Sequence, residues 1–243
     1  SSPFILLNIL IAFDFLYVYV SMYTGVVSRI DPSTNTIDKT VAVGPNPEEM
    51  VIVNKSLYVT NSDGNNYNAG YANGKSVSKI SLSDFVEEKK IAVGLNPTKI
   101  TADALGNVLV LCMGDYSATP ATVWKINAED EATSMNIPAT IMDIKDNSLY
   151  VINAPYGAPS ITYTVYNTSS GAVEKENFVS APVDAPAGIA VHSDGRIFIT
   201  SYTLVGGFAS YKTPGYVSEY SSDGTFVKKY DVGVGAVSMT FLK

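Results

Sequence analysis

The sequence predicts an all-β fold, a β-propeller of four-stranded antiparallel blades, and two observations support this prediction. The first is composition: charged residues make up only 16% of the 243 residues, while 18 Gly and 16 Tyr suit a turn-rich β protein. The second is an internal repeat of roughly 40 to 50 residues, each copy holding four short β-like segments. A repeat of this length and content is typical of a propeller blade.

The repeat is clearest in two copies. Residues 27–61 read VSRIDPSTNTIDKTVAVGPNPEEMVIVNKSLYVTN, and residues 77–112 read VSKISLSDFVEEKKIAVGLNPTKITADALGNVLVLC. Within them, VAVGPNP at 41–47 returns as IAVGLNP at 91–97. Weaker copies cover 123–153 and 163–201, and a partial copy covers 216–242. The same unit therefore recurs along most of the chain.

Each copy contains four strand types in a fixed order. The first type is apolar and follows Asn-Pro or Ala-Pro, near 48–53, 98–103, 139–144, 187–192 and 236–241. The second is a run similar to Leu-Tyr-Val that follows a tight polar turn. Such runs begin at Leu57, Val108, Leu149 and Ile197, and residues 15–21 are the corresponding strand of the first copy. The third includes Val27, Val77, Val123, Val165 and Val217, and the fourth resembles TVAV or KIAV. About twenty strands, or five blades, result.

The two chain ends leave alternatives open. Residues 236–242 (AVSMTFL) would complete the blade that the N-terminus begins, which closes the ring and removes free sheet edges. Alternatively, ILIAFD at 9–14 resembles a first strand and would begin a sixth, incomplete blade. We expect residues 1–243 to form a single propeller domain, with 1–14 as an extra strand or a remnant.

Composition also excludes several classes of function. With 16 Lys and Arg against 23 Asp and Glu, the net charge of -7 makes nucleic acid an unsuitable partner. One cysteine, Cys112, and one histidine, His192, exclude zinc fingers, disulfide scaffolds and HExxH-type hydrolases. The apolar residues 4–20 are interrupted by Asn8 and Asp14 and lack basic flanks, so we expect neither a signal peptide nor a membrane-spanning segment there. A targeting segment, if the gene encodes one, is expected upstream.

The pattern GxNPxxM, LYVTNSDG, VSKIxL and IAVG resembles the YVTN-repeat β-propellers, and LYVTN at 57–61 contains the namesake tetrapeptide. The similarity covers residues 26–242. More narrowly, NPEEMVIVNKSLYVTNSDG and NPTKITADALGNVLVLCMGDY are similar to surface-layer-type propellers of the Bacteroides group. The resemblance implies an exported lipoprotein, and some members are surface partners of TonB-dependent transporters that capture nutrients, including cobalamin. About seven blades are expected in that family, so six blades, or part of a seven-bladed ring, are alternatives to five.

The connections between strands predict where a site would lie. Because successive strands are antiparallel, connections between second and third strands emerge at one face and those between first and second strands at the other. The latter are short, such as 54–56 and 145–148. Between second and third strands the connections are long, at 62–76, 113–121, 154–161 and 202–214, and the connection 22–25 of the first unit emerges at the same face. We call the face that bears them the long-loop face.

Tyrosine and asparagine gather on these long connections. Tyr rings offer flat contact area at low entropic cost and Asn amides offer hydrogen bonds, which suits a polar, partly apolar ligand such as a sugar or a corrinoid. The alternative is that each Tyr packs its own loop onto the blade. The candidate ligand-binding residues are Tyr23, Asp63, Tyr67, Tyr71, Asp115, Tyr116, Tyr156, Tyr202 and Tyr211.

Other chemical candidates are weaker. Residues 63–68 (DGNNYN) partly resemble a calcium loop, but Tyr67 replaces the third oxygen ligand and no Glu stands at the twelfth position. We therefore expect no cofactor, with calcium as the alternative. Structural roles are expected for His192, Cys112 and Trp124, a solvated face for Glu48-Glu49 and Glu87-Glu88, and chance glycosylation patterns at Asn54 and Asn167.

The sequence thus predicts a non-enzymatic, exported, monomeric β-propeller at the outer-membrane surface or in the periplasm. Its long-loop face would bind a small molecule or glycan, or an outer-membrane transporter, as the capture component of a glycan or cobamide uptake system. One alternative is a hydrolase or lactonase that uses a divalent metal in the channel. Another is a purely structural surface-layer module.

Overall fold

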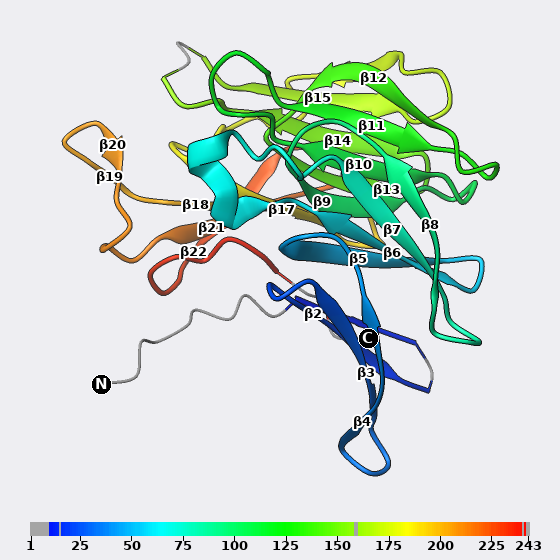
Figure 1. Ribbon diagram of the computed structural model, residues 1–243. Helices are drawn as coiled ribbons and strands as arrows, with labels where there is room; N and C mark the ends of the chain where they lie inside the picture. The colour runs from blue at the N-terminus through cyan, green and yellow to red at the C-terminus, as the bar shows by residue number, and fades with distance from the viewer. Residues whose placement is uncertain (1–9, 15, 158–159, 240, 242–243) are drawn as a thin grey trace. The chain divides into compact units, whose positions relative to one another are not determined.

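The computed structural model describes residues 10–14, 16–157, 160–239 and 241. Their strands form five four-stranded antiparallel sheets and one short hairpin (Figure 1). The chain divides into two compact units: unit 1, Ser1–Pro138, which contains three of the sheets, and unit 2, Ala139–Lys243, which contains the other two and the hairpin. The all-β prediction is confirmed.

Within each sheet of unit 1, each strand pairs with the next one along the chain. The first sheet contains β1 (Leu10–Phe13), β2 (Val18–Met22), β3 (Val26–Asp31) and β4 (Thr36–Ala42). The second contains β5 (Pro47–Val53), β6 (Ser56–Asn61), β7 (Ser76–Ser81) and β8 (Glu87–Ala92). The third contains β9 (Pro97–Ala102), β10 (Val108–Cys112), β11 (Thr122–Ile126) and β12 (Ala132–Pro138). A 3-10 helix, Gly64–Ala69, interrupts the β6–β7 connection.

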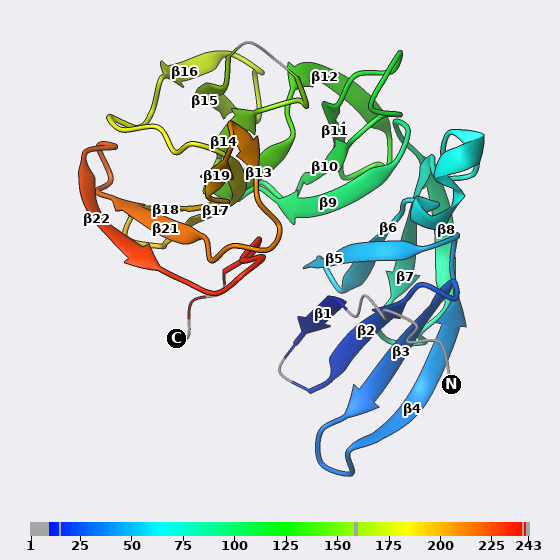
Figure 2. The same cartoon turned by 90° about the vertical axis from the view of Figure 1, so that its left-hand side faces the viewer.

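Unit 2 repeats the same order with one insertion (Figure 2). Its first sheet contains β13 (Ile141–Lys145), β14 (Ser148–Asn153), β15 (Thr162–Asn167) and β16 (Val173–Glu176). Its second contains β17 (Pro186–Val191), β18 (Ile197–Ser201), β21 (Tyr216–Tyr220) and β22 (Phe226–Asp231). The hairpin of β19 (Leu204–Val205) and β20 (Phe208–Ala209) is inserted between β18 and β21.

The structure of the chain ends differs from the first prediction, in which the C-terminal residues complete the blade that the N-terminus begins. β1 pairs antiparallel with β2, with Phe13 opposite Val18, so the first-strand position of the N-terminal sheet is filled by residues 10–13. Residues 236–239, predicted as a first strand, are not in a strand, and that prediction is wrong for them. The second alternative, in which ILIAFD forms a first strand, is confirmed for residues 10–13. The rest of the segment 1–14, residues 1–9, lies outside the described residues, and the blade number of a complete ring stays a prediction.

The apolar cores lie between neighbouring sheets. The Leu-Tyr-Val type strands supply them, since residues on both faces of these inner strands are buried: all five residues of β10 and all six of β6. In unit 1, one core joins the first and second sheets through Tyr19, Val27, Leu57 and Ile80. In unit 2, the segment 177–185 adds Phe178, Val179 and Val183 to the core. Burial of these side chains stabilises the stacking of the sheets.

Gly44 of the repeated VAVG motif and Asn61, the last residue of LYVTN, contact each other directly. A Cβ on Gly44 would lie 2.5 Å from Cγ of Asn61, so only glycine fits against this side chain. In return, Gly44 N donates to Asn61 Oδ1 at 3.0 Å. Asn61 Nδ2 donates to the hydroxyls of Ser76 and Ser78 at 3.1 and 3.0 Å. The buried amide therefore ties the β4–β5 connection to β6 and β7.

Candidate functional site

All nine predicted ligand-binding residues lie on connections between second and third strands, as the sequence indicated. Six belong to unit 1: Tyr23 on β2–β3; Asp63, Tyr67 and Tyr71 on β6–β7; Asp115 and Tyr116 on β10–β11. Three belong to unit 2: Tyr156 on β14–β15, and Tyr202 and Tyr211 on either side of the β19–β20 hairpin.

One carboxylate outside the predicted set, that of Glu48, joins the β2–β3 and β6–β7 connections of unit 1. Glu48 lies near the start of β5, and its Oε1 atom accepts a hydrogen bond from Tyr23 Oη at 2.6 Å and one from Ser62 Oγ at 3.1 Å. Gly64 packs against the same group, since a Cβ there would lie 3.5 Å from Glu48 Oε1 and 3.9 Å from Tyr23 Oη. We call Tyr23, Glu48 and Ser62 the Glu48 cluster.

The repeated Asn-Pro turns hold these loops in place. Asn46 adopts a left-handed conformation with φ 44°. Its Nδ2 donates to the carbonyl of Tyr23 at 3.0 Å, and its Oδ1 accepts from Asn65 N at 2.9 Å. Asn96, at φ 56°, donates its N–H to the carbonyl of Gly74 at 2.7 Å and accepts from Met113 N at 2.8 Å. The turn that defines the repeat therefore also positions the long loops.

Two tyrosines from different sheets meet beside this cluster. The rings of Tyr71 and Tyr116 are 6.0 Å apart at an interplanar angle of 62°, an edge-to-face contact. Tyr116 is nevertheless 64% exposed. Partial burial and Tyr71 raise the pKa of Tyr116, a hydrogen bond with Asn96 acts in the opposite direction, and the charge of Glu48 adds a smaller upward effect. The structure thus pairs Tyr71 of the β6–β7 connection with Tyr116 of the β10–β11 connection, while Tyr23 belongs to the Glu48 cluster.

The electrostatics of Glu48 differ from those expected of a solvated surface acid. Burial raises the pKa of Glu48, while the hydrogen bonds from Tyr23 and Ser62 act in the opposite direction. Its neighbour Glu49 instead forms an ion pair with Lys99 of β9 and accepts from Ile100 N at 3.4 Å. The solvated-face interpretation is therefore wrong for Glu48, because its neighbours come from loops that are distant in sequence.

The raised pKa of Glu48 predicts a pH-dependent loss of stability. In the native state Glu48 keeps its proton at pH values where the unfolded chain has released it, so stability falls as the pH rises above the ordinary value of 4.5. The Gln side chain of Glu48→Gln does not titrate. The difference in melting temperature between Glu48→Gln and the wild type should therefore shift in favour of the variant as the pH rises above 4.5. Scanning fluorimetry from about pH 4 to 8 measures the difference. Glu129→Gln, an exposed control, should show no such trend; an equal offset at every pH would contradict the prediction.

The two acidic candidates are engaged within their own loops. Asp63 Oδ2 accepts from Asn66 Nδ2 and from Asn73 N, both at 2.9 Å. Asp115 Oδ1 accepts from the N–H groups of Ser117 and Thr119. These bonds lower the pKa of Asp115 and shape the loop turns. Tyr67, on the 3-10 helix, is 63% exposed.

The residues expected to be structural occupy packed or locally bonded positions. Cys112 is buried, and burial raises the pKa of its thiol to about 12. The Nε1 atom of Trp124 would lie 2.5 Å from a Cβ on Gly94, so the indole packs against the repeat glycine. His192 Nδ1 lies 2.8 Å from Asp194 Oδ1, and its ring meets that of Phe241 with centroids 4.8 Å apart.

In unit 2 the predicted residues form a different arrangement. Tyr202 and Tyr211 pack edge to face with centroids 4.9 Å apart at the base of the β19–β20 hairpin. Tyr156 is 97% exposed. Within unit 2, none of the described contacts joins Tyr156 to the Tyr202–Tyr211 pair.

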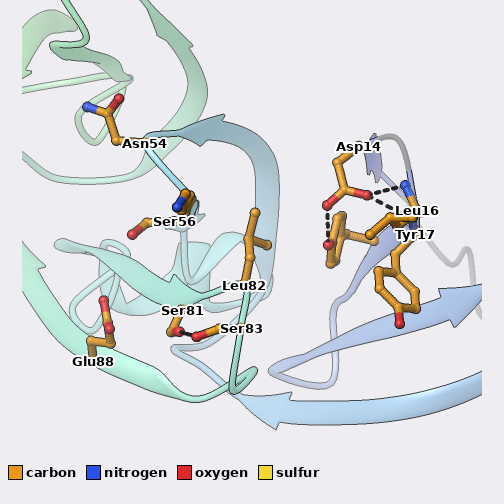
Figure 3. Close-up of a pocket in the computed structure, with 11 residues that line it drawn as sticks. Asp14, Leu16, Tyr17, Asn54, Ser56, Ser81, Leu82, Ser83 and Glu88 are labelled. Carbon is orange, nitrogen blue, oxygen red and sulfur yellow. Dashed lines mark hydrogen bonds between the residues drawn. The ribbon is translucent and has the colours of Figure 1, made fainter.

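A pocket of 470 Å³ lies at the opposite ends of the strands of unit 1, where the β1–β2, β5–β6 and β7–β8 connections converge (Figure 3). Several of its polar groups are already paired. Asp14 accepts from Leu16 N, Tyr17 N and Tyr19 Oη, and the hydroxyls of Ser81 and Ser83 bond to each other at 2.9 Å. We therefore select the Glu48 cluster and the Tyr71–Tyr116 pair as the candidate site.

Solved structures resemble this chain closely enough to define its fold. Hydrazine synthase of Kuenenia stuttgartiensis superposes with a TM-score of 0.66 at 17% identity, over 94% of this chain and 66% of that one. A functionally unknown protein from Desulfotomaculum acetoxidans gives 0.64 at 12% identity, over 93% and 70%. A luciferin-regenerating enzyme gives 0.56 at 10% identity, over 91% and 75%. The fold is β-propeller-like.

These likenesses concern the fold alone, because the identities are low. This chain spans about two thirds of the length of the hydrazine synthase chain. No protein-family profile and no curated protein matches the sequence. Within the described residues, no three His, Cys, Asp or Glu side chains form a group that could hold a metal ion. The described helical segments include none with the length and apolarity to cross a bilayer.

Proposed function

We propose that this β-propeller-like chain is a non-enzymatic binding protein whose long-loop face captures a polyhydroxylated ligand, a glycan or a cobamide. It would act as an exported capture component of a nutrient-uptake system, as the resemblance to YVTN-repeat propellers suggests. The observation that carries the proposal is a chain of contacts between connections of unit 1. The Glu48 cluster joins the β2–β3 and β6–β7 connections, and the Tyr71–Tyr116 pair joins the β6–β7 and β10–β11 connections.

The chemistry of the cluster supports this class of ligand. Tyr23 and Ser62 both bond to Glu48 Oε1, so we assign Oε2 to a ligand hydroxyl. The exposed ring of Tyr116 supplies a flat apolar surface that suits the C–H face of a sugar or a corrinoid ring. The turns at Asn46 and Asn96 hold the loops in position before binding, which lowers the entropic cost.

The experiment is a binding titration with a panel of oligosaccharides and cobamides. Tyr116→Ala should weaken binding of a positive ligand by about tenfold or more, because it removes the exposed stacking surface. Glu48→Gln should also weaken binding while leaving the fold intact. Ile37→Ala, an exposed apolar truncation on the outer strand β4, is the matched control and should bind as the wild type does.

Two results would contradict the proposal. Binding that is lost in Tyr156→Ala but retained in Tyr116→Ala would place the site in unit 2. A complete absence of binding would favour the purely structural surface-layer module. The hydrolase or lactonase alternative needs a bound divalent metal, and a stoichiometric metal in the purified protein together with esterase activity would support it instead.

A further inference from the structure

The β19–β20 hairpin of unit 2 presents an apolar tip to solvent. Leu204, Val205 and Phe208 are 41%, 58% and 70% exposed. Gly206 and Gly207 link the two short strands at φ 61° and 86°, the left-handed conformations of a tight hairpin turn. In Figure 1 the hairpin projects beyond the ends of β18 and β21. Exposed apolar side chains gathered on one projection are typical of an interaction surface.

The hairpin is held in shape from its base rather than from its tip. Ser210 N donates to the carbonyl of Thr203 at 2.9 Å, and Thr203 Oγ1 donates to the carbonyl of Pro214 at 2.8 Å. Below the tip, Tyr202 and Tyr211 pack edge to face across the two arms. The tip is therefore presented by a fixed stem, and no described core cluster includes its apolar side chains.

The charge of this connection is unlike that of the rest of the chain. Residues 202–215 (YTLVGGFASYKTPG) contain no Asp or Glu and one Lys, Lys212, although the whole protein carries a net charge of -7. From the tip of the hairpin toward its base, the apolar side chains come first, then Tyr202 and Tyr211, and then Lys212. Membrane-interface segments show the same order: apolar groups enter the acyl region, Tyr lies at the headgroups, and Lys meets lipid phosphates.

We propose that the β19–β20 hairpin inserts its tip into a lipid surface, with Leu204, Val205 and Phe208 in the acyl boundary and Tyr202, Tyr211 and Lys212 at headgroup level. The hairpin is a peripheral anchor, because three apolar side chains give weak, reversible partitioning. This role is independent of the Glu48 cluster, which lies in unit 1.

The test is vesicle co-sedimentation of the full chain with phosphatidylcholine vesicles, alone and mixed with phosphatidylglycerol. The wild type should partition into both compositions, since the apolar tip supplies the affinity. The double variant Leu204→Ser/Phe208→Ser should lower the partition coefficient by about tenfold or more, since it removes most of the inserted apolar area. Val173→Ser, also an exposed apolar residue of unit 2, is the matched control and should partition as the wild type does.

Two further measurements keep the proposal falsifiable. Phe208→Trp places a reporter at the tip, and its fluorescence should shift to the blue and be quenched by brominated acyl chains. Lys212→Glu should reduce binding to anionic vesicles and spare binding to phosphatidylcholine. The proposal is overturned if the wild type does not bind vesicles, or if the double serine variant binds equally well. A hairpin that docks into a protein groove instead would give the first of these outcomes.

Discussion

Replacing Gly224 by Ala is expected to destabilise unit 2 by about 4 kcal/mol. Gly224 ends the turn between β21 and β22 at φ 89°, a left-handed conformation that strains a residue with a side chain. An added Cβ would lie 1.8 Å from the carbonyl oxygen of Phe178, so the backbone must move. That movement breaks the hydrogen bond from Ser180 N to the Gly224 carbonyl, now 2.8 Å.

The neighbouring sheet offers a matched control. Gly171 ends the equivalent turn between β15 and β16 at φ 72°, but no atom lies within 4 Å of a Cβ built there. Gly171→Ala should therefore lower the free energy of unfolding by only about 1 kcal/mol, the cost of placing a residue with a side chain at positive φ. Urea unfolding followed by circular dichroism measures both variants. Equal destabilisation by the two substitutions would show that strain at positive φ, and not contact with segment 177–180, decides the effect.

The second large effect is expected at Asn61. Asn61→Ala should destabilise unit 1 by about 3 kcal/mol, because it removes three hydrogen bonds and leaves the N–H of Gly44 buried without its acceptor. Trp124, the only tryptophan, lies in unit 1 and reports its unfolding by fluorescence. The midpoint in urea should fall markedly relative to the wild type.

An exposed asparagine on the adjoining loop is the control for Asn61. Asn68→Ala, in the 3-10 helix, should change stability by less than about 0.5 kcal/mol. A loss at Asn61 no larger than that at Asn68 would mean that water reaches Gly44 N in the variant. The second copy of the repeat has Cys112 facing Gly94 at the corresponding place, where the thiol takes the backbone hydrogen bond of the glycine in place of the Asn side chain.

Much of the fold followed from local patterns in the sequence. Apolar strands, polar turns and the Asn-Pro motif predicted the first strands to within about two residues at 47–53, 97–102, 141–145 and 186–191. Turn glycines such as Gly106 and Gly195 adopt the positive φ values that a tight turn requires. Residues 236–239 were misassigned because their apolar pattern resembles a first strand, whereas residues 10–13 fill that position by pairing with β2.

The candidate site was only partly predictable. The sequence placed Tyr23, Tyr71 and Tyr116 on connections of the same type, since alternation of strand direction determines the end from which each connection leaves. It assigned Glu48 to a solvated face, because nothing within a few residues of Glu48 indicates burial. Its hydrogen-bond partners, Tyr23 and Ser62, are 25 and 14 residues away.

By itself, then, the sequence determined the strands, their order and the loops on which Tyr and Asn gather, because periodicity and turn chemistry act over a few residues. Tertiary structure alone decided that Glu48 accepts hydrogen bonds from Tyr23 and Ser62 on two separate connections and that Tyr71 meets Tyr116. It also decided that Leu204 and Phe208 remain exposed on a projecting hairpin. Burial and exposure of this kind depend on which distant segments pack together, and no local pattern records that.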